Sequence, residues 1–162
     1  MTAGKIHNKL ADIRNAGARV KLISDGDVAA SIEAALPGRE VDVLMGVGGT
    51  PEGVISAAAI RCIGGGIQCL AWPRDDNERK AAIAAGINVD KVYEIDDLIE
   101  GDDVFFAATG VSSGELLKGI RYLGGRAQTQ SLAMRGRSGT LRWIDSWHNF
   151  ERLDKLSFLK LH

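Results

Sequence analysis

The sequence contains few cysteines, almost no net charge and no long apolar run, and each absence excludes a class of protein. Two cysteines in 162 residues are too few for a disulfide framework, so Cys62 and Cys69 are expected to be reduced thiols in the core. A net charge of −1 gives no basis for binding nucleic acid or an anionic membrane. No apolar run approaches the ~20 residues of a membrane span, and the first 14 residues lack the apolar core of a signal peptide. These features predict a soluble, cytoplasmic protein.

The glycine-rich loops also lack the two commonest nucleotide-binding patterns. The stretch GVGGTPEG does not end in the Lys-Ser/Thr pair of a P-loop and does not fit the dinucleotide pattern GxGxxG, so ATP and NAD are disfavoured. Glycine itself is plentiful, with 20 residues that fall mostly between predicted elements, as in a protein with many functional loops. With 45% apolar residues, the chain is expected to fold as a single domain over residues 1–162.

Apolar spacing and turn residues predict alternating strands and helices followed by an antiparallel hairpin. Strands are expected at 18–23, 41–45, 68–72, 91–95 and 103–108. Helices are expected at 7–16, 28–36, 50–63 and 75–85, with a single turn at 96–101. The hairpin joins residues 126–136 to 138–147, while 116–123 suits either a helix or a strand and 148–162 either a small helix or a tail. This order predicts a layered α/β fold with a mixed sheet.

The stretch from Val41 to Gly66 is the part around which the rest of the chain is organised. Thr50 is suited to cap the following helix and Pro51 to occupy its first position, which places Glu52 in the first turn. A glycine loop that enters a helix binds anions, and a carboxylate there repels a phosphate unless a metal ion lies between them. Glu52 is therefore either a metal ligand or a charge that complements the helix dipole.

Three polar loops follow three of the predicted strands: SDGD, GVGGTPEG and ATGVSSGE. If those strands are parallel neighbours, the loops open at the same sheet edge, where ligands bind in open α/β sheets. In SDGD, two carboxylates flank Gly26 and suit either sugar hydroxyls and a hard cation or a tight turn that caps a helix. Residues expected to line one cleft are Asp25, Gly49, Glu52 and Thr109.

Four longer motifs are similar to a known family. ARVKLISDGDVAASI, DVLMGVGGTPEGVISAAAIRCIGG, GDDVFFAATGVSSGELLKGIRYLGG and SLAMRGRSGTLRWI together resemble the C-terminal half of class II fructose-1,6-bisphosphatases. The similarity is greatest to the bacterial and cyanobacterial type that also accepts sedoheptulose-1,7-bisphosphate, and it runs from about residue 5 to about residue 148. It implies a layered α/β/α fold like that of the inositol monophosphatase superfamily. It also implies hydrolysis of the 1-phosphate with Mg²⁺ or Mn²⁺, in gluconeogenesis or the Calvin cycle.

The resemblance also implies roles for individual residues. Glu52 matches the metal-binding glutamate of the family's GGxPEG motif. The matches to substrate-binding positions are Lys5, Asp25, Gly26, Asp27 and Gly49. Lys5 stands for a phosphate-binding arginine, whereas Ala3 stands where the family has a lysine. The family's catalytic threonine and its remaining metal-binding carboxylates lie in an N-terminal half, so no catalytic residue is assigned within this chain.

The function implied by the resemblance is a sugar bisphosphatase present as its C-terminal half. Its substrate would be a sugar bisphosphate, and its protein partner either further copies of the chain or a chain that supplies the N-terminal half. The alternative is a non-catalytic module for sugar-phosphate binding or oligomerisation. Apolar surface that an N-terminal half would cover predicts self-association.

Overall fold

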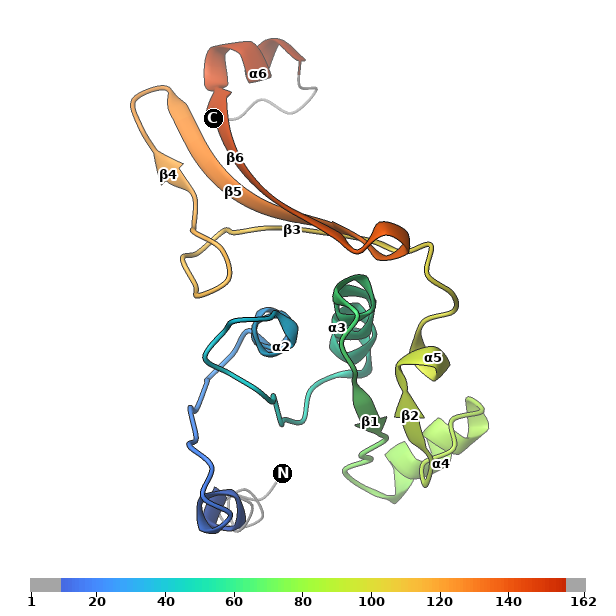
Figure 1. Cartoon of the computed structure of the whole chain (residues 1–162). Helices are drawn as coiled ribbons and strands as arrows, with labels where there is room; N and C mark the ends of the chain where they lie inside the picture. Colours follow the sequence, from blue (N-terminus) through green and yellow to red (C-terminus); the bar gives the residue numbers. More distant parts are fainter. Residues whose placement is uncertain (1–9, 157–162) are drawn as a thin grey trace. The chain divides into compact units, whose positions relative to one another are not determined.

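The computed structural model (Figure 1) describes residues 10–156, without the side chains of Asp154 and Leu156. The chain divides into two compact units. The first unit comprises Met1–Gly26 and Leu70–Lys91, and the second comprises Asp27–Cys69 and Val92–His162. Lys5 lies outside the described residues. Among residues 10–156, no helix combines the length and the apolar character needed to cross a membrane.

The first unit begins with the helix expected near the N-terminus. Residues 10–15 are helical, and Gly17 follows in a left-handed conformation with φ +84°. The strand expected at Ala18–Ile23 is wrong, because this segment forms no strand. Two of its apolar side chains are exposed to solvent instead, Leu22 to 68% and Ile23 to 44%.

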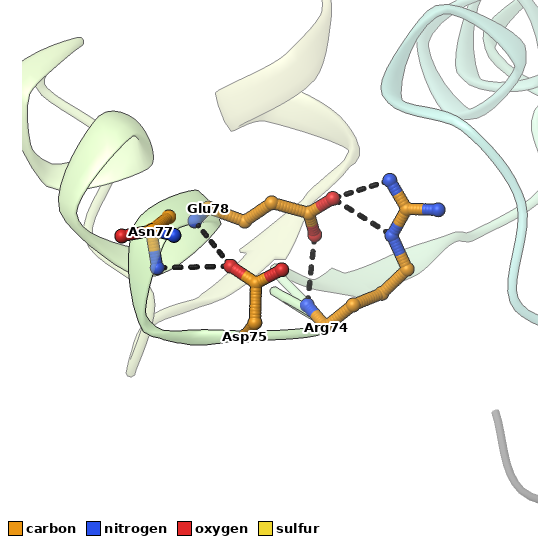
Figure 2. A network of polar contacts seen from close by, with 4 residues as sticks. All are labelled: Arg74, Asp75, Asn77 and Glu78. Atoms are coloured by element: carbon orange, nitrogen blue, oxygen red, sulfur yellow. Dashed lines mark hydrogen bonds and ion pairs between the residues drawn. The ribbon is translucent and has the colours of Figure 1, made fainter.

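Helix α4 (Asp76–Ala84) is held by local polar contacts rather than by burial, since none of its residues is buried. The Oδ1 atom of Asp75 accepts hydrogen bonds from the backbone N–H groups of Asn77 and Glu78, both at 2.9 Å. Figure 2 shows that the Glu78 carboxylate turns back to Arg74, where it accepts from the backbone N at 2.8 Å and from Nε at 2.7 Å. These contacts satisfy donors that the first turn of a helix leaves free, which explains why the sequence located this helix correctly.

Two helices of the second unit form one side of its core. Helix α2 (Asp27–Ala35) buries Ile32, and helix α3 (Thr50–Ile63) buries Ala59 and Cys62. Both helices match the sequence prediction, and α3 ends as expected at Gly64, whose φ is +82°. Its start differs by one residue. Gly49 is the N-cap and Thr50 is already helical, so the predicted Thr50 cap is wrong.

A four-stranded antiparallel sheet forms the other side of this core. It consists of β3 (Phe105–Thr109), β4 (Arg121–Tyr122), β5 (Arg126–Arg135) and β6 (Thr140–Asn149). Strand β5 is central: β3 and β4 pair along one edge, and β6 pairs along the other over ten residue pairs. The β5–β6 hairpin confirms the prediction, with a 3₁₀ turn at Gly136–Ser138 as its connection.

The two faces of this sheet differ in what they contact. On one, here called the inner face, Leu132 and Met134 of β5 are buried in a cluster that includes residues of α2 and α3. Phe106 and Ala108 of β3 pack against the same cluster. Side chains alternate along a strand, so the intervening residues, such as Phe105 at 68% exposure, lie on the outer face.

The remaining elements of the second unit are short, and β1 ends at Leu70, the first residue after a boundary between the units. Strands β1 (Gln68–Leu70) and β2 (Val92–Glu94) form a two-stranded sheet, each shorter than predicted. Helix α5 (Ile95–Leu98) is the expected single turn, and α6 (Phe150–Leu156) shows that the C-terminal segment starts as a helix. The segment at 116–123 is mostly irregular and forms only β4.

The strand expected at Val41–Met45 is also wrong, as residues 41–49 form no regular element. Val43 and Met45 are exposed to 68% and 66%. A strand exists only where a neighbouring strand accepts and donates its backbone hydrogen bonds, and no described segment pairs with this one. Two of the three strands expected to be parallel neighbours are therefore absent. The described fold is α/β with an antiparallel four-stranded sheet.

Candidate functional site

The candidate site lies at the start of α3, where the glycine loop enters the helix. Gly49 caps the helix in an extended conformation (φ −73°, ψ 156°), and its carbonyl accepts a hydrogen bond from the Gly53 N–H at 3.1 Å. Glu52 lies in the first turn and is exposed. Its carboxylate folds back against Gly49, so closely that a Cβ atom at that position would overlap Oε2. The absence of a side chain at Gly49 thus makes room for the Glu52 carboxylate.

A second carboxylate lies against the preceding glycine. Asp27 is the first residue of α2, and a Cβ atom at Gly48 would lie 3.0 Å from its Oδ2 atom. Two packed helices therefore each direct an acidic side chain from their first turn toward consecutive glycines of one loop. The positive ends of the helix dipoles stabilise both charges. Exposed carboxylate oxygens beside free backbone are suited to a hard cation or to sugar hydroxyls.

The described residues do not by themselves form a complete divalent cation site. Among residues 10–156, no group of three or more histidine, cysteine, aspartate or glutamate side chains is placed to hold a metal ion. Mg²⁺ and Mn²⁺ prefer about six oxygen ligands. Glu52, with or without Asp27, supplies only a fraction of such a set.

The SDGD loop adopts the tight turn that its sequence allows. Gly26 has φ +80°, a left-handed conformation that strains any residue with a side chain, and α2 begins at the next residue. Asp25, in the first unit, is exposed. The turn therefore explains the need for Gly26, while the two aspartates remain available to solvent.

Two polar side chains of the third predicted loop, those of Thr109 and Ser113, make their contacts elsewhere. The Thr109 hydroxyl forms a 2.8 Å hydrogen bond with the Ser131 hydroxyl on the outer face of the sheet, whereas α3 packs on the inner face. The Ser113 hydroxyl accepts a hydrogen bond from the Gly119 N–H at 3.0 Å within its own loop. The expectation that Thr109 lines a cleft with Glu52 is thus wrong. Side-chain alternation along β3 turns the hydroxyl to the opposite side of the sheet.

Sequence reasoning missed Arg61, which fixes the other end of α3. Its guanidinium donates to the Gly101 carbonyl at 3.2 Å and pairs with Asp102 at 2.8 Å and with Asp96. The hydrogen bond to Asp96 is the main reason that the pKa of Arg61 is raised. The signal was present in the sequence: α3 contains one basic residue in an otherwise apolar second half, and an acidic segment follows at 96–103.

The contacts of Arg61 and its neighbour set the direction of α3 against the sheet. The Cys62 thiol lies 3.6 Å from the Val104 carbonyl, just before β3 begins. The C-terminal end of α3 is thus anchored beside the start of β3, and Glu52 lies at the far end of the same helix. Arg61 thereby helps to hold the helix that carries Glu52 without being near it.

The two cysteines are free thiols, as predicted. Cys62 is buried and Cys69 is half-buried. Burial raises the pKa of both thiols, because it disfavours the charged thiolate. Neither group is therefore an activated nucleophile.

Comparisons with known proteins agree with the motifs. Residues 5–148 match the family described as bacterial fructose-1,6-bisphosphatase, glpX-encoded. The chain is 42% identical over 160 residues to a class 2 fructose-1,6-bisphosphatase of Haemophilus influenzae, covering 91% of this chain and 48% of that protein.

Two cyanobacterial relatives carry the name D-fructose 1,6-bisphosphatase class 2/sedoheptulose 1,7-bisphosphatase. The protein of Microcystis aeruginosa is 43% identical over 156 residues, covering 88% of this chain and 45% of its own length. That of Thermosynechococcus vestitus is 43% identical over 171 residues, covering 96% and 49%. The chain therefore spans about half the length of the curated relatives it matches.

Proposed function

This chain belongs to the bacterial, glpX-encoded fructose-1,6-bisphosphatase family, and on that basis we propose that it forms part of a metal-dependent sugar-bisphosphate 1-phosphatase. Its substrate is fructose-1,6-bisphosphate, and sedoheptulose-1,7-bisphosphate is a second one, in keeping with the names of two relatives. The observation that supports this function best is the placement of the Glu52 and Asp27 carboxylates against Gly49 and Gly48.

In this proposal each residue of the site has a separate task. Glu52 provides one ligand of a Mg²⁺ or Mn²⁺ site, and Gly49 leaves space for that carboxylate and for the substrate backbone. Asp25 and Asp27, on either side of Gly26, accept hydrogen bonds from sugar hydroxyls. Lys5 pairs with a phosphate group. The bound cation, when its ligand set is complete, offsets the negative charge of the phosphate.

The remaining ligands come from an N-terminal half that this chain does not contain, in keeping with the 45–49% of each relative's length that it matches. Together the two halves form the layered α/β/α fold of the inositol monophosphatase superfamily, with residues 1–162 as its C-terminal domain. The exposed segments at 18–23 and 41–49 then act as strands, because the other half offers them hydrogen-bonding partners. We place the assembled enzyme in the cytoplasm, in gluconeogenesis or the Calvin cycle.

The test is phosphate release from both sugar bisphosphates in Mn²⁺ or Mg²⁺, using the purified chain with and without the N-terminal half of the Haemophilus influenzae relative. We expect turnover only when both halves are present. Glu52→Gln should abolish it, because a neutral amide is a far weaker ligand for a hard cation. Glu100→Gln, a change at an exposed glutamate in the loop after α5, should not.

Absence of phosphate release in every combination would refute the proposal. If Glu52→Gln keeps normal turnover across a Mn²⁺ titration, the Glu52 carboxylate is not a metal ligand and only complements the helix dipole.

One observation favours a second candidate, a non-catalytic sugar-phosphate-binding module: the described residues lack a three-ligand cluster. Calorimetry separates the two functions. If the chain is a binding module, the isolated chain binds fructose-1,6-bisphosphate without metal and without phosphate release. If it is part of a bisphosphatase, binding requires both the N-terminal half and the cation.

A further inference from the structure

Strand β6 presents an unusually long free edge. All ten of its residues pair with β5, and β5 is the one strand that pairs with β6 in the described part of the chain. Strands average about five or six residues, so ten is long. The N–H and C=O groups on the far side of β6 can accept another strand.

Most of the devices that usually protect such an edge are missing from β6, although Asp145 is a charged residue on the inner face. Its sequence, TLRWIDSWHN, contains no proline, lysine or glycine, and its unbroken register with β5 leaves no bulge. Its two charged residues, Arg142 and Asp145, have opposite signs, so two copies do not repel each other. Large apolar side chains are exposed along it, with Trp143 at 44%, Ile144 at 41% and Trp147 at 60%. Tryptophan is enriched where protein surfaces associate.

The sequence of β6 also suits pairing with itself. The two copies are related by a two-fold axis perpendicular to the joined sheet, which keeps both inner faces on the same side. Residues directly opposite each other must then lie on the same face. The axis therefore passes through a pair formed by one residue and its own copy, and not between two residues. Centring on Asp145 sets two carboxylates directly opposite, which is unfavourable. Centring on Ile144 avoids this clash, places Ile144 opposite its own copy, and pairs Leu141 with Trp147 on the inner face. This register includes nine residues of each strand, 140–148.

We propose that two copies of this chain associate through antiparallel pairing of their β6 strands, centred on Ile144, so that their sheets join into one. The pairing rests on the edge itself and does not depend on bisphosphatase activity. In this arrangement a second copy covers the free edge of β6, whereas an N-terminal half would cover the segments at 18–23 and 41–49.

A single cysteine placed at the centre tests the register. Opposite Cα atoms in an antiparallel pair are about 4.5–5.5 Å apart, within the range of a disulfide, so Ile144→Cys should cross-link into a dimer under mild oxidation. Arg142→Cys is the matched control, because it is exposed on the same outer face of the same strand. Its own copy lies about 14 Å away in this register, four residues along the strand, and should not cross-link. The parent chain gives the background from Cys62 and Cys69.

A charge at the same position tests the association itself. Ile144→Lys brings two ammonium groups together and should raise the dimer dissociation constant at least tenfold by sedimentation, with an unchanged circular dichroism spectrum. Val111→Lys, at a loop residue exposed to 77%, should leave it unaltered.

The proposal fails if the parent chain is monomeric at tens of micromolar. It also fails if both cysteine variants cross-link equally, or if Ile144→Lys dimerises like the parent. An added N-terminal half that binds and prevents the Ile144→Cys cross-link would assign this edge to that half, and would equally overturn self-pairing.

Discussion

Replacing Gly49 by alanine tests whether the glycine loop serves to hold the Glu52 carboxylate. The backbone of Gly49 is in the extended region, with φ −73° and ψ 156°, so alanine adopts it without strain. The added Cβ atom overlaps the Oε2 atom of Glu52 and lies 3.5 Å from Cδ of Pro51. Because a flexible side chain is displaced and not the backbone, the carboxylate rotates away while the helix remains.

The expected loss of stability is small. Alanine is a poorer N-cap than glycine by roughly 0.5–1 kcal/mol. Moving the Glu52 charge from the helix start costs about 0.3–1 kcal/mol more. The total of about 1–2 kcal/mol lowers Tm by roughly 2–8 °C in a chain of this size.

The expected loss of activity is much larger. Displacing a ligand by about 1 Å can reduce turnover on the order of 10²-fold. Phosphate release is measured against Mn²⁺ concentration with the N-terminal half supplied. Gly46→Ala is the matched control in the same loop, since a Cβ atom there meets nothing within 4 Å. Equal turnover and equal Mn²⁺ dependence in the two variants would show that room at Gly49 is irrelevant to the carboxylate.

Three further predictions concern the fold. Leu132→Ala should lower the free energy of unfolding by about 2–5 kcal/mol in a denaturant titration, because this side chain is fully buried in β5; a change under 1 kcal/mol would contradict the assigned core. Asp75→Ala should destabilise by about 0.5–2 kcal/mol through loss of the α4 cap, while Asp76→Ala, one residue into the helix, should cost less. The raised pKa values of Cys62 and Cys69 contribute stability that is present below pH 9 and is lost as pH rises through these pKa values. The denaturant midpoint of unfolding is measured at pH 8 and pH 10 for the parent and for Cys62→Ala. An equal change of the midpoint in both proteins would contradict the burial of the Cys62 thiol.

The helices of this chain were predictable because their signals are local. The cap at Asp75, the glycine that ends α3 and the spacing of apolar residues in α2 all act within a few residues of each helix. The β5–β6 hairpin was predictable for the same reason, since its turn and both strands are contiguous. The Thr50 cap failed by one residue, within the usual uncertainty of helix ends.

The predictions that failed depend on partners remote in the sequence. Residues 18–23 and 41–45 have the alternating or apolar pattern of strands, but a pattern cannot provide the neighbour that a strand requires. Thr109 was expected in the loop just after a strand but is the last residue of β3, and the face to which it points depends on the register with β5. For the candidate site, the sequence located Glu52 at a helix start, whereas the closeness of Asp27 to Gly48 became evident only from the packing of α2 on α3.

The position of β5 in the chain has a consequence for biosynthesis. The central strand of the sheet, with Leu132 and Met134, ends at residue 135, which is 72 residues after the end of α3 at residue 63. At about 5–20 residues per second, translation takes roughly 4–14 s to cover that interval. A hairpin itself forms in microseconds, so synthesis and not folding sets the delay. During those seconds α2 and α3 have no sheet to cover their apolar sides, and the nascent chain is a natural substrate for chaperones that bind such surfaces.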